Sequence, residues 1–221
     1  MQNTSSVEQT QSGVLSTNKV LRQTYALLSM TLLFSAAMAV VSIVMAVPHG
    51  LAMGASIGAI VLLMFVLPRF EESAAGIGLV FLATGLLGFG LGPMLTYYLN
   101  FGGGPATIAT ALAGTGVIFL ALSAYVLTTK KDFSFMGGFL MVGLIVIFGG
   151  IILNLFLQIP AMSLAISAGL ILLMSGFILF DTSRIINGGE TNYIRATVSL
   201  FINIFNIFTS LLHILGVMGD E

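Results

Sequence analysis

The chain has 221 residues, of which 57% are hydrophobic and 7% charged, with a formal net charge of -1 and no cysteine. A soluble domain carries about 25% charged residues, so most of this surface must face lipid rather than water. The charge balance argues against nucleic acid as a partner, and the lack of cysteine excludes disulfides, thiol catalysis and thiolate metal sites.

The amino-terminal segment is polar, and Glu8 is the only charged residue between Met1 and Asn18. A run of Ser, Thr, Gln and Asn cannot bury enough apolar surface to fold, so we expect 1–18 to be a disordered tail. No basic region precedes a short apolar core, which excludes a secretory signal. The remainder, 19–221, is predicted to be one bundle of spanning helices.

Seven apolar segments are long enough to cross a bilayer, given about 20 residues per helical span. Two stretches without charge, 73–129 and 133–180, are each too long for one crossing. The Asn-Phe-Gly-Gly-Gly-Pro turn at 100–105 and the Gln-Ile-Pro turn at 158–160 divide them. The predicted spans are Tyr25–Val47, Leu51–Leu67, Ala74–Leu99, Pro105–Leu127, Phe135–Leu157, Pro160–Phe180 and Ala196–Leu215.

The placement of basic residues supports the count of seven independently. Every Lys and Arg falls on the same side as the amino terminus: Lys19, Arg22, Arg69, Lys130, Lys131, Arg184 and Arg195. The positive-inside rule then predicts a cytoplasmic amino terminus and a carboxyl terminus on the other side. Because backbone groups in lipid must be satisfied internally, the predicted fold class is an all-α integral membrane protein, a seven-transmembrane helical bundle.

Small residues on two spans predict close contacts between helices. The second span carries Gly54 and Gly58, four residues apart, and we expect Pro93 to kink or fray the third span. The third span has a similar series of small residues, Gly85, Gly88 and Gly92.

The seventh span carries one polar stripe on an otherwise apolar helix. Its members recur at intervals of four, three, four and three residues: Ser199, Asn203, Asn206, Ser210 and His213. Two interpretations stay open. The stripe either forms hydrogen bonds between helices, worth ~0.6 kcal/mol per contact, or lines a polar pathway through the bundle.

Asp181 directly follows the apolar run of the sixth span and is the acid closest to the membrane phase. An ionised Asp at the bilayer centre costs about 2.5–3.5 kcal/mol, so a basic or hydrogen-bonding partner is expected. Asp181 is either an interfacial anchor at the end of its helix or a titratable latch that closes this end of the bundle. Arg69, Arg184 and Arg195 lie on the same side.

The turn 187–190 (Asn-Gly-Gly-Glu) predicts the end of one helix, and Thr191 or Asn192 can cap the next. The sequence contains no H-E-x-x-H or G-x-S-x-G motif, no acids paired within one span and no cluster of metal ligands. We therefore predict that the protein is not an enzyme and needs no cofactor or metal.

Three segments of the carboxy-terminal third resemble the Bax inhibitor family of seven-span membrane proteins: 180–183 (Phe-Asp-Thr-Ser), 188–196 (Gly-Gly-Glu-Thr-Asn-Tyr-Ile-Arg-Ala) and 200–208. Segments 16–22, 123–129 and 157–161 are similar to its bacterial YccA branch, the modulators of the membrane protease FtsH. The resemblance covers nearly the whole chain. It implies a bacterial inner-membrane location and a central seventh span wrapped by the other six.

Some members of that family act as pH-sensitive calcium leaks, in which an Arg latches two aspartates. The resemblance implies that Asp181 and Arg69 correspond to the first aspartate and the Arg. Asn203 stands at the second aspartate position and cannot titrate. Gly58 stands at or near the place of a further acid. Both departures weaken calcium as a partner.

The preferred functional hypothesis is a regulator that binds and inhibits a membrane-anchored, ATP-dependent protease of the FtsH type, with that protease's associated regulators as further candidate partners. Such a protease needs a flexible handle before it can pull on a membrane substrate, and the tail from Met1 through Glu8 to Asn18 would be that handle. The alternative is a pH-sensitive calcium or proton leak gated near Asp181.

Overall fold

The computed structural model describes residues 3–100 and 103–219, and within these ranges it contains helices and no strand. Seven helices of this described part are long and apolar enough to cross a membrane. The all-α, seven-span prediction is therefore confirmed, and the chain is an integral membrane protein. The spans are Thr17–Val44, His49–Arg69, Ala74–Asn100, Pro105–Thr129, Ser134–Leu157, Pro160–Ile186 and Tyr193–Gly219.

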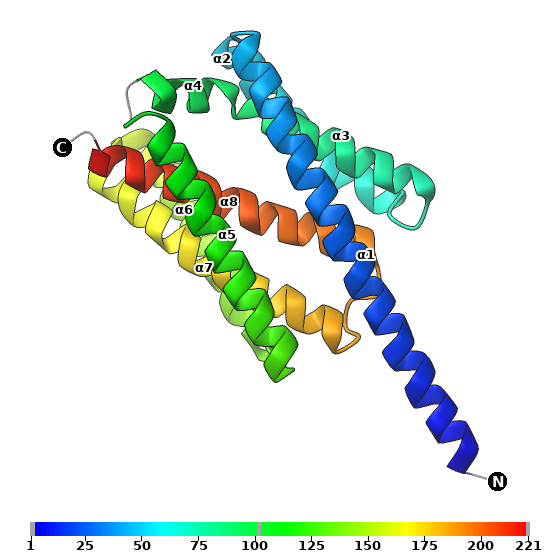
Figure 1. The fold of residues 1–221 in the computed structure, drawn as a ribbon. Coiled ribbons are helices and arrows are strands. Elements are labelled where there is room, and N and C mark those ends of the chain that lie inside the picture. Colours follow the sequence, from blue (N-terminus) through cyan, green and yellow to red (C-terminus); the bar gives the residue numbers. More distant parts are fainter. Residues whose placement is uncertain (1–2, 101–102, 220–221) are drawn as a thin grey trace.

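The helices follow one another through short connections (Figure 1). Their bounds are α1 (Asn3–Val44), α2 (His49–Val61), η1 (Leu62–Val66), η2 (Leu67–Arg69), α3 (Ala74–Gly90), α4 (Gly92–Asn100), α5 (Pro105–Thr129), η3 (Ser134–Met136), α6 (Gly137–Leu157), α7 (Pro160–Ile186) and α8 (Tyr193–Gly219).

Both turns predicted within the long uncharged stretches are present. α4 ends at Asn100 and α5 begins at Pro105, and Gly103 and Gly104 adopt positive φ angles of 75° and 71°. Gln158, with a φ of 53°, ends α6 before Pro160 opens α7. Proline suits the first helical position because its missing N–H would have no partner there.

Prolines also explain the irregular parts of two spans. The predicted break at Pro93 is confirmed, because α3 ends at Gly90 and α4 begins at Gly92, turned away from the axis of α3 (Figure 1). The second span ends as a π-helix and then a 3-10 helix around Pro68. Pro68 has no N–H to continue the α-helical ladder, so the hydrogen-bonding pattern changes there.

The amino-terminal segment differs from the prediction of a disordered tail. Within the described residues, α1 is one helix from Asn3 to Val44, so most of 1–18 is helical; Met1 lies outside the described residues. No proline interrupts 3–18, and propagating a helix from an existing span avoids the unfavourable nucleation step. Figure 1 shows this part of α1 projecting beyond the bundle.

The seventh span lies at the centre of the bundle, as predicted, but its main contacts are with four helices, α7, α5, α1 and α3, and not with all six other spans. In its most apolar stretch 50% of the residues are buried, against 6% for the span Ser134–Leu157. We name the two ends of the bundle after the charged residues that they carry or lack. Among the described residues, all Lys, Arg, Asp and Glu lie toward one end, the charged end, and none lies at the other, the uncharged end.

The predicted glycine contacts hold for one span and fail for the other. A Cβ added at Gly88 would overlap the backbone oxygen of Ser35, so α1 and α3 pack there with their backbones close together. Gly85 and Gly92 likewise face α1. A Cβ at Gly54 or Gly58 would meet nothing within 4 Å, so the predicted close packing through these two glycines is wrong; α2 meets α3 instead through Ser56, which lies against Gly90.

Candidate functional site

Asp181 lies inside a helix and not at its end. α7 continues to Ile186, and the Asp181 side chain is buried against α8. Ser199 Oγ and Asn203 Nδ2 both donate hydrogen bonds to Asp181 Oδ2, at 2.6 and 2.8 Å. The expected helix end is wrong because these two groups satisfy the carboxyl within the bundle, so the helix need not stop where the acid begins.

The polar stripe of α8 therefore faces α7. His213, near the uncharged end, lies with its Nδ1 2.8 Å from Ser167 Oγ of α7. Asn206 instead donates a 2.8 Å hydrogen bond to the carbonyl of Ile202 in its own helix. Ser210 is buried.

The stripe is not a continuous polar path. Between the Asp181 and His213 contacts, the buried side chains of Met174, Ile178 and Ile207 belong to one apolar cluster. Of the two interpretations left open by the sequence, the hydrogen bonds between α7 and α8 account for Ser199, Asn203 and His213. Each such bond avoids an unsatisfied polar group in hydrocarbon.

Arg69 does not meet Asp181 in the structure. It ends η2, is exposed, and forms no ion pair among the described residues. The Asp181 carboxyl is therefore bound by the neutral donors Ser199 and Asn203, and not by the Arg69 guanidinium that a latch would use. A latch role for Asp181, Arg69 and Asn203 stays a prediction.

The basic partners at this end belong to a different network, which we call the charged clasp and define as Glu71, Arg184, Glu190, Asn192 and Arg195. Arg195 binds the Glu71 carboxylate through two nitrogens, Nη2 to Oε1 at 2.5 Å and Nε to Oε2 at 3.3 Å. Glu190 Oε2 lies 3.6 Å from Arg184 and 3.8 Å from Arg195. A two-point Arg–carboxylate contact is geometrically specific.

Asn192 completes the clasp and begins α8. Its Oδ1 accepts hydrogen bonds from the backbone N–H of Ile194 and Arg195, and its Nδ2 donates to the carbonyl of Glu71. The predicted capping role of this segment is therefore confirmed at Asn192. One side chain fixes the start of the central helix and ties it to the connection between the second and third spans.

A second set of polar contacts, outside the clasp, holds the connection between α5 and η3 at the charged end. Ser183 Oγ accepts a 2.8 Å hydrogen bond from the backbone N–H of Phe133 and lies 3.4 Å from Asp132 Oδ1. Asp132 also accepts a 2.8 Å bond from the backbone N–H of Ser134. The hydrogen bonds from Ser134 lower the pKa of the Asp132 carboxyl, because they favour its charged form.

The clasp escaped prediction from the sequence. Glu71 and Arg195 are 124 positions apart, and only the packing of their helices makes them neighbours. The available signal was charge: Glu71, Glu72 and Glu190 are acids on the same side as four arginines. That signal indicates some pairing but cannot select the partners. Among the described residues, no three His, Asp or Glu side chains come together as metal ligands would.

A seven-span bundle whose central helix donates hydrogen bonds to a buried carboxyl of the neighbouring span defines a class of polytopic membrane protein. The family model described as "Inhibitor of apoptosis-promoting Bax1" matches residues 17–220, and the chain belongs to this Bax inhibitor family. It is 54% identical over 205 residues to the "Modulator of FtsH protease YccA" of Escherichia coli K12, covering 92% of each chain. The same figures hold for the "Inner membrane protein YccA" of E. coli O6:H1. It is also 50% identical to a Vibrio cholerae protein named only as an uncharacterized membrane protein, covering 99% and 96% of the two chains.

Proposed function

We propose that this protein is a non-enzymatic regulator that binds a membrane-anchored, ATP-dependent protease of the FtsH type and inhibits its action on other substrates. The carrying observation is the 54% identity, over 92% of both chains, to a protein named as a modulator of that protease. Similarity at this level extends over all seven spans and not only over one motif.

The orientation that suits this function places the charged end and the amino terminus in the cytoplasm of a bacterium, with the carboxyl terminus in the periplasm. The positive-inside rule supports it, because the described connections at the other end carry no Lys or Arg. One relative is named an inner membrane protein, which supports that membrane as the location.

The structure also supports a protein that the protease begins to unfold from its amino-terminal helix and whose membrane bundle then resists extraction. The stretch 3–16 of α1 lies ahead of the first span and projects from the bundle, so a protease can reach it (Figure 1). Most helical stability in proteins comes from packing against other elements, so a polar stretch that projects into water unwinds readily when pulled. The candidate handle runs from Met1 through Glu8 to Asn18, and its described part, from Asn3 on, thus acts as a helix that melts and not as a disordered tail.

The test is to co-purify the full chain with the protease and to measure turnover of a second membrane substrate. We expect complex formation and slower turnover. Deleting 1–16 should remove most of the inhibition, whereas replacing these residues with an unrelated polar sequence of equal length should retain it. Absence of both binding and any effect on turnover would refute the proposal.

A second candidate, a pH-dependent calcium or proton leak, is favoured by one observation. Asp181 is buried within a membrane span, and the hydroxyls of Thr182 and Ser123 are buried without a hydrogen-bond partner among the described residues. Reconstitution into dye-loaded liposomes separates the two candidates. Flux that depends on pH and is lost in Asp181→Asn would support the leak, and no flux at any pH would exclude it.

A further inference from the structure

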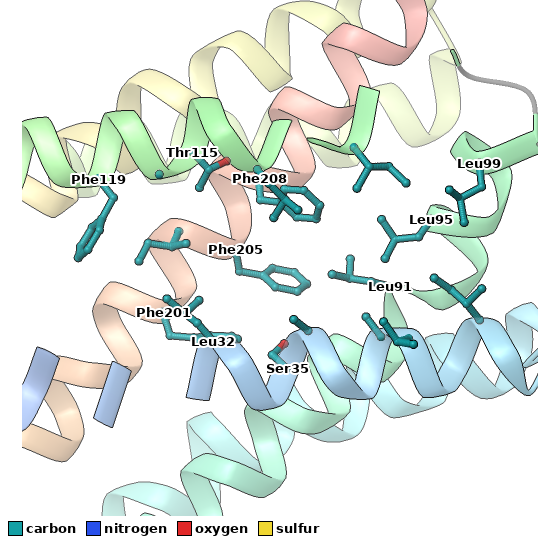
Figure 2. Close-up of a pocket in the computed structure, with 18 residues that line it drawn as sticks. Leu32, Ser35, Leu91, Leu95, Leu99, Thr115, Phe119, Phe201, Phe205 and Phe208 are labelled. Carbon is teal, nitrogen blue, oxygen red and sulfur yellow. The ribbon is translucent and has the colours of Figure 1, made fainter. Parts of the chain in front are cut away.

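The uncharged half of the bundle contains a cavity of about 500 Å³ between four helices. α1 and α5 form its facing walls, α8 forms its floor, and the α3–α4 break closes one end (Figure 2). Eighteen residues line it, and only Ser35 and Thr115 have polar side chains. Thr115 already donates its hydroxyl hydrogen to the carbonyl of Ala111 at 2.7 Å.

The cavity opens sideways toward the membrane. Its floor residues Phe201 and Phe208 are 1% and 8% exposed, whereas Val40 of α1 and Leu112 of α5 are 58% and 56% exposed. The rim is therefore continuous with the apolar outer surface of α1 and α5. A water molecule needs two to four polar partners, which these walls do not offer, so hydrocarbon is the medium that can fill the space.

The length of the cavity matches one leaflet. Its lining runs from Leu32 to Ile43 on α1 and from Ile108 to Phe119 on α5. Eleven helical steps at 1.5 Å each give ~16 Å. Half of a hydrocarbon core of about 30 Å is ~15 Å, the depth that acyl chains of one leaflet fill.

The occupant of the cavity must be apolar along its whole length. The lining holds no charged side chain, and the Thr115 hydroxyl already donates to a carbonyl of its own helix. A lipid acyl chain has this chemistry, and one leaflet supplies it at this depth. We propose that this cavity is a binding site for one acyl chain of a membrane lipid, which enters between α1 and α5 from the leaflet at the uncharged end.

Two glycines provide a blocking variant and a matched control. Gly116 lines the cavity and a Cβ there would meet nothing within 4 Å, so Gly116→Leu is chosen to narrow the cavity. Gly149 of α6 is equally open and does not line the cavity, so Gly149→Leu is the control. Equal melting temperatures of the two variants would show that both are folded.

The first measurement is the lipid that stays bound to the purified full chain after extensive detergent washing, counted by native mass spectrometry. We expect about one bound molecule for the wild type and Gly149→Leu, and at least a tenfold loss for Gly116→Leu. The mass of the released molecule tells a phospholipid from a free fatty acid. Equal retention by all three proteins, or none by the wild type, would overturn the proposal.

The second measurement uses the absence of tryptophan from the chain. Phe205→Trp reports from the cavity, and Phe156→Trp reports from the exposed surface of α6, where Phe156 is 78% exposed. Titration with phospholipid brominated in its acyl chains should quench the indole of Phe205→Trp at a several-fold lower lipid fraction than the indole of Phe156→Trp. Quenching at equal fractions, or a photo-crosslinker at Leu112 that captures only protein, would contradict acyl-chain binding.

Discussion

The two halves of the bundle are held together in different ways. At the charged end, side chains from separate connections bind one another through the clasp, and Asp181 accepts two hydrogen bonds from the central helix. In the uncharged half, polar contacts such as His213 with Ser167 join α7 and α8, whereas α1, α3, α4 and α5 meet through small residues or diverge around an apolar cavity. Within lipid there is no hydrophobic force between helices, so position depends on close packing or on polar contacts. Where neither is present, a space remains.

The largest effect is expected where packing alone positions the helices. Gly88→Val should destabilise the protein by on the order of 3 kcal/mol or more, because its Cβ would overlap a backbone oxygen of α1 that cannot rotate away. Unfolding in a denaturing detergent measures this. Gly78→Val, on the same helix but facing open space, should change stability by less than about 1 kcal/mol. Equal effects would show that the α1–α3 contact is not tight.

The next effect tests the carboxyl at the charged end. Asp181→Leu leaves the donors of Ser199 and Asn203 without an acceptor, so we expect a loss of about 2 kcal/mol. Asp181→Asn retains an acceptor and should cost about half as much. The same unfolding assay compares the two variants. If the two variants were equally destabilised, the negative charge of Asp181, and not its capacity to accept hydrogen bonds, would stabilise the contact between α7 and α8.

A smaller effect is expected for the clasp, because the Arg195 side chain is 53% exposed. Arg195→Ala should cost about 1 kcal/mol and speed amide hydrogen exchange in the connection 187–192. Arg195→Lys keeps the charge but loses the two-point contact, so it should fall between. Arg69→Ala is the control, since Arg69 has no ion pair among the described residues. An equal loss of stability in Arg69→Ala would show that the ion pairs of the clasp are not the cause of the effect.

The smallest effect concerns Asp132. Because its pKa lies below the ordinary 3.8, its charged form stabilises the fold above pH 3.8, and this stabilisation is lost as the pH falls through the lowered pKa. The melting temperature of Asp132→Ala should therefore lie slightly below that of the wild type at pH 6, and the difference should shrink as the pH is lowered below 3.8. A difference that does not change with pH would assign the effect to packing.

Sequence patterns were sufficient for elements whose cause is local. The seven spans follow from apolar length, the turns at 100–105 and 158–160 from Gly and Pro, and the cap at Asn192 from its side chain. The pairing of Asp181 with α8 was only partly predictable. The polar stripe showed which face of α8 needs a partner, but not that α7 supplies it.

Other features could not be predicted because they depend on which helices become neighbours. Gly54 and Gly88 have the same kind of local sequence, yet only Gly88 faces a backbone. Arg69 and Arg195 are both basic residues on one side of the membrane, yet only Arg195 reaches Glu71. The apolar cavity has no sequence signal, since its lining residues are ordinary residues of a span.

The unbroken first helix sets a distance. α1 has 42 residues, of which the span takes 28. The remaining 14 residues extend the rod by ~21 Å at 1.5 Å per residue. A molecule in the surrounding water therefore first meets the chain at this distance from the start of the span, before any unwinding, and inserting one helical turn before Thr17 would lengthen that reach by ~5 Å.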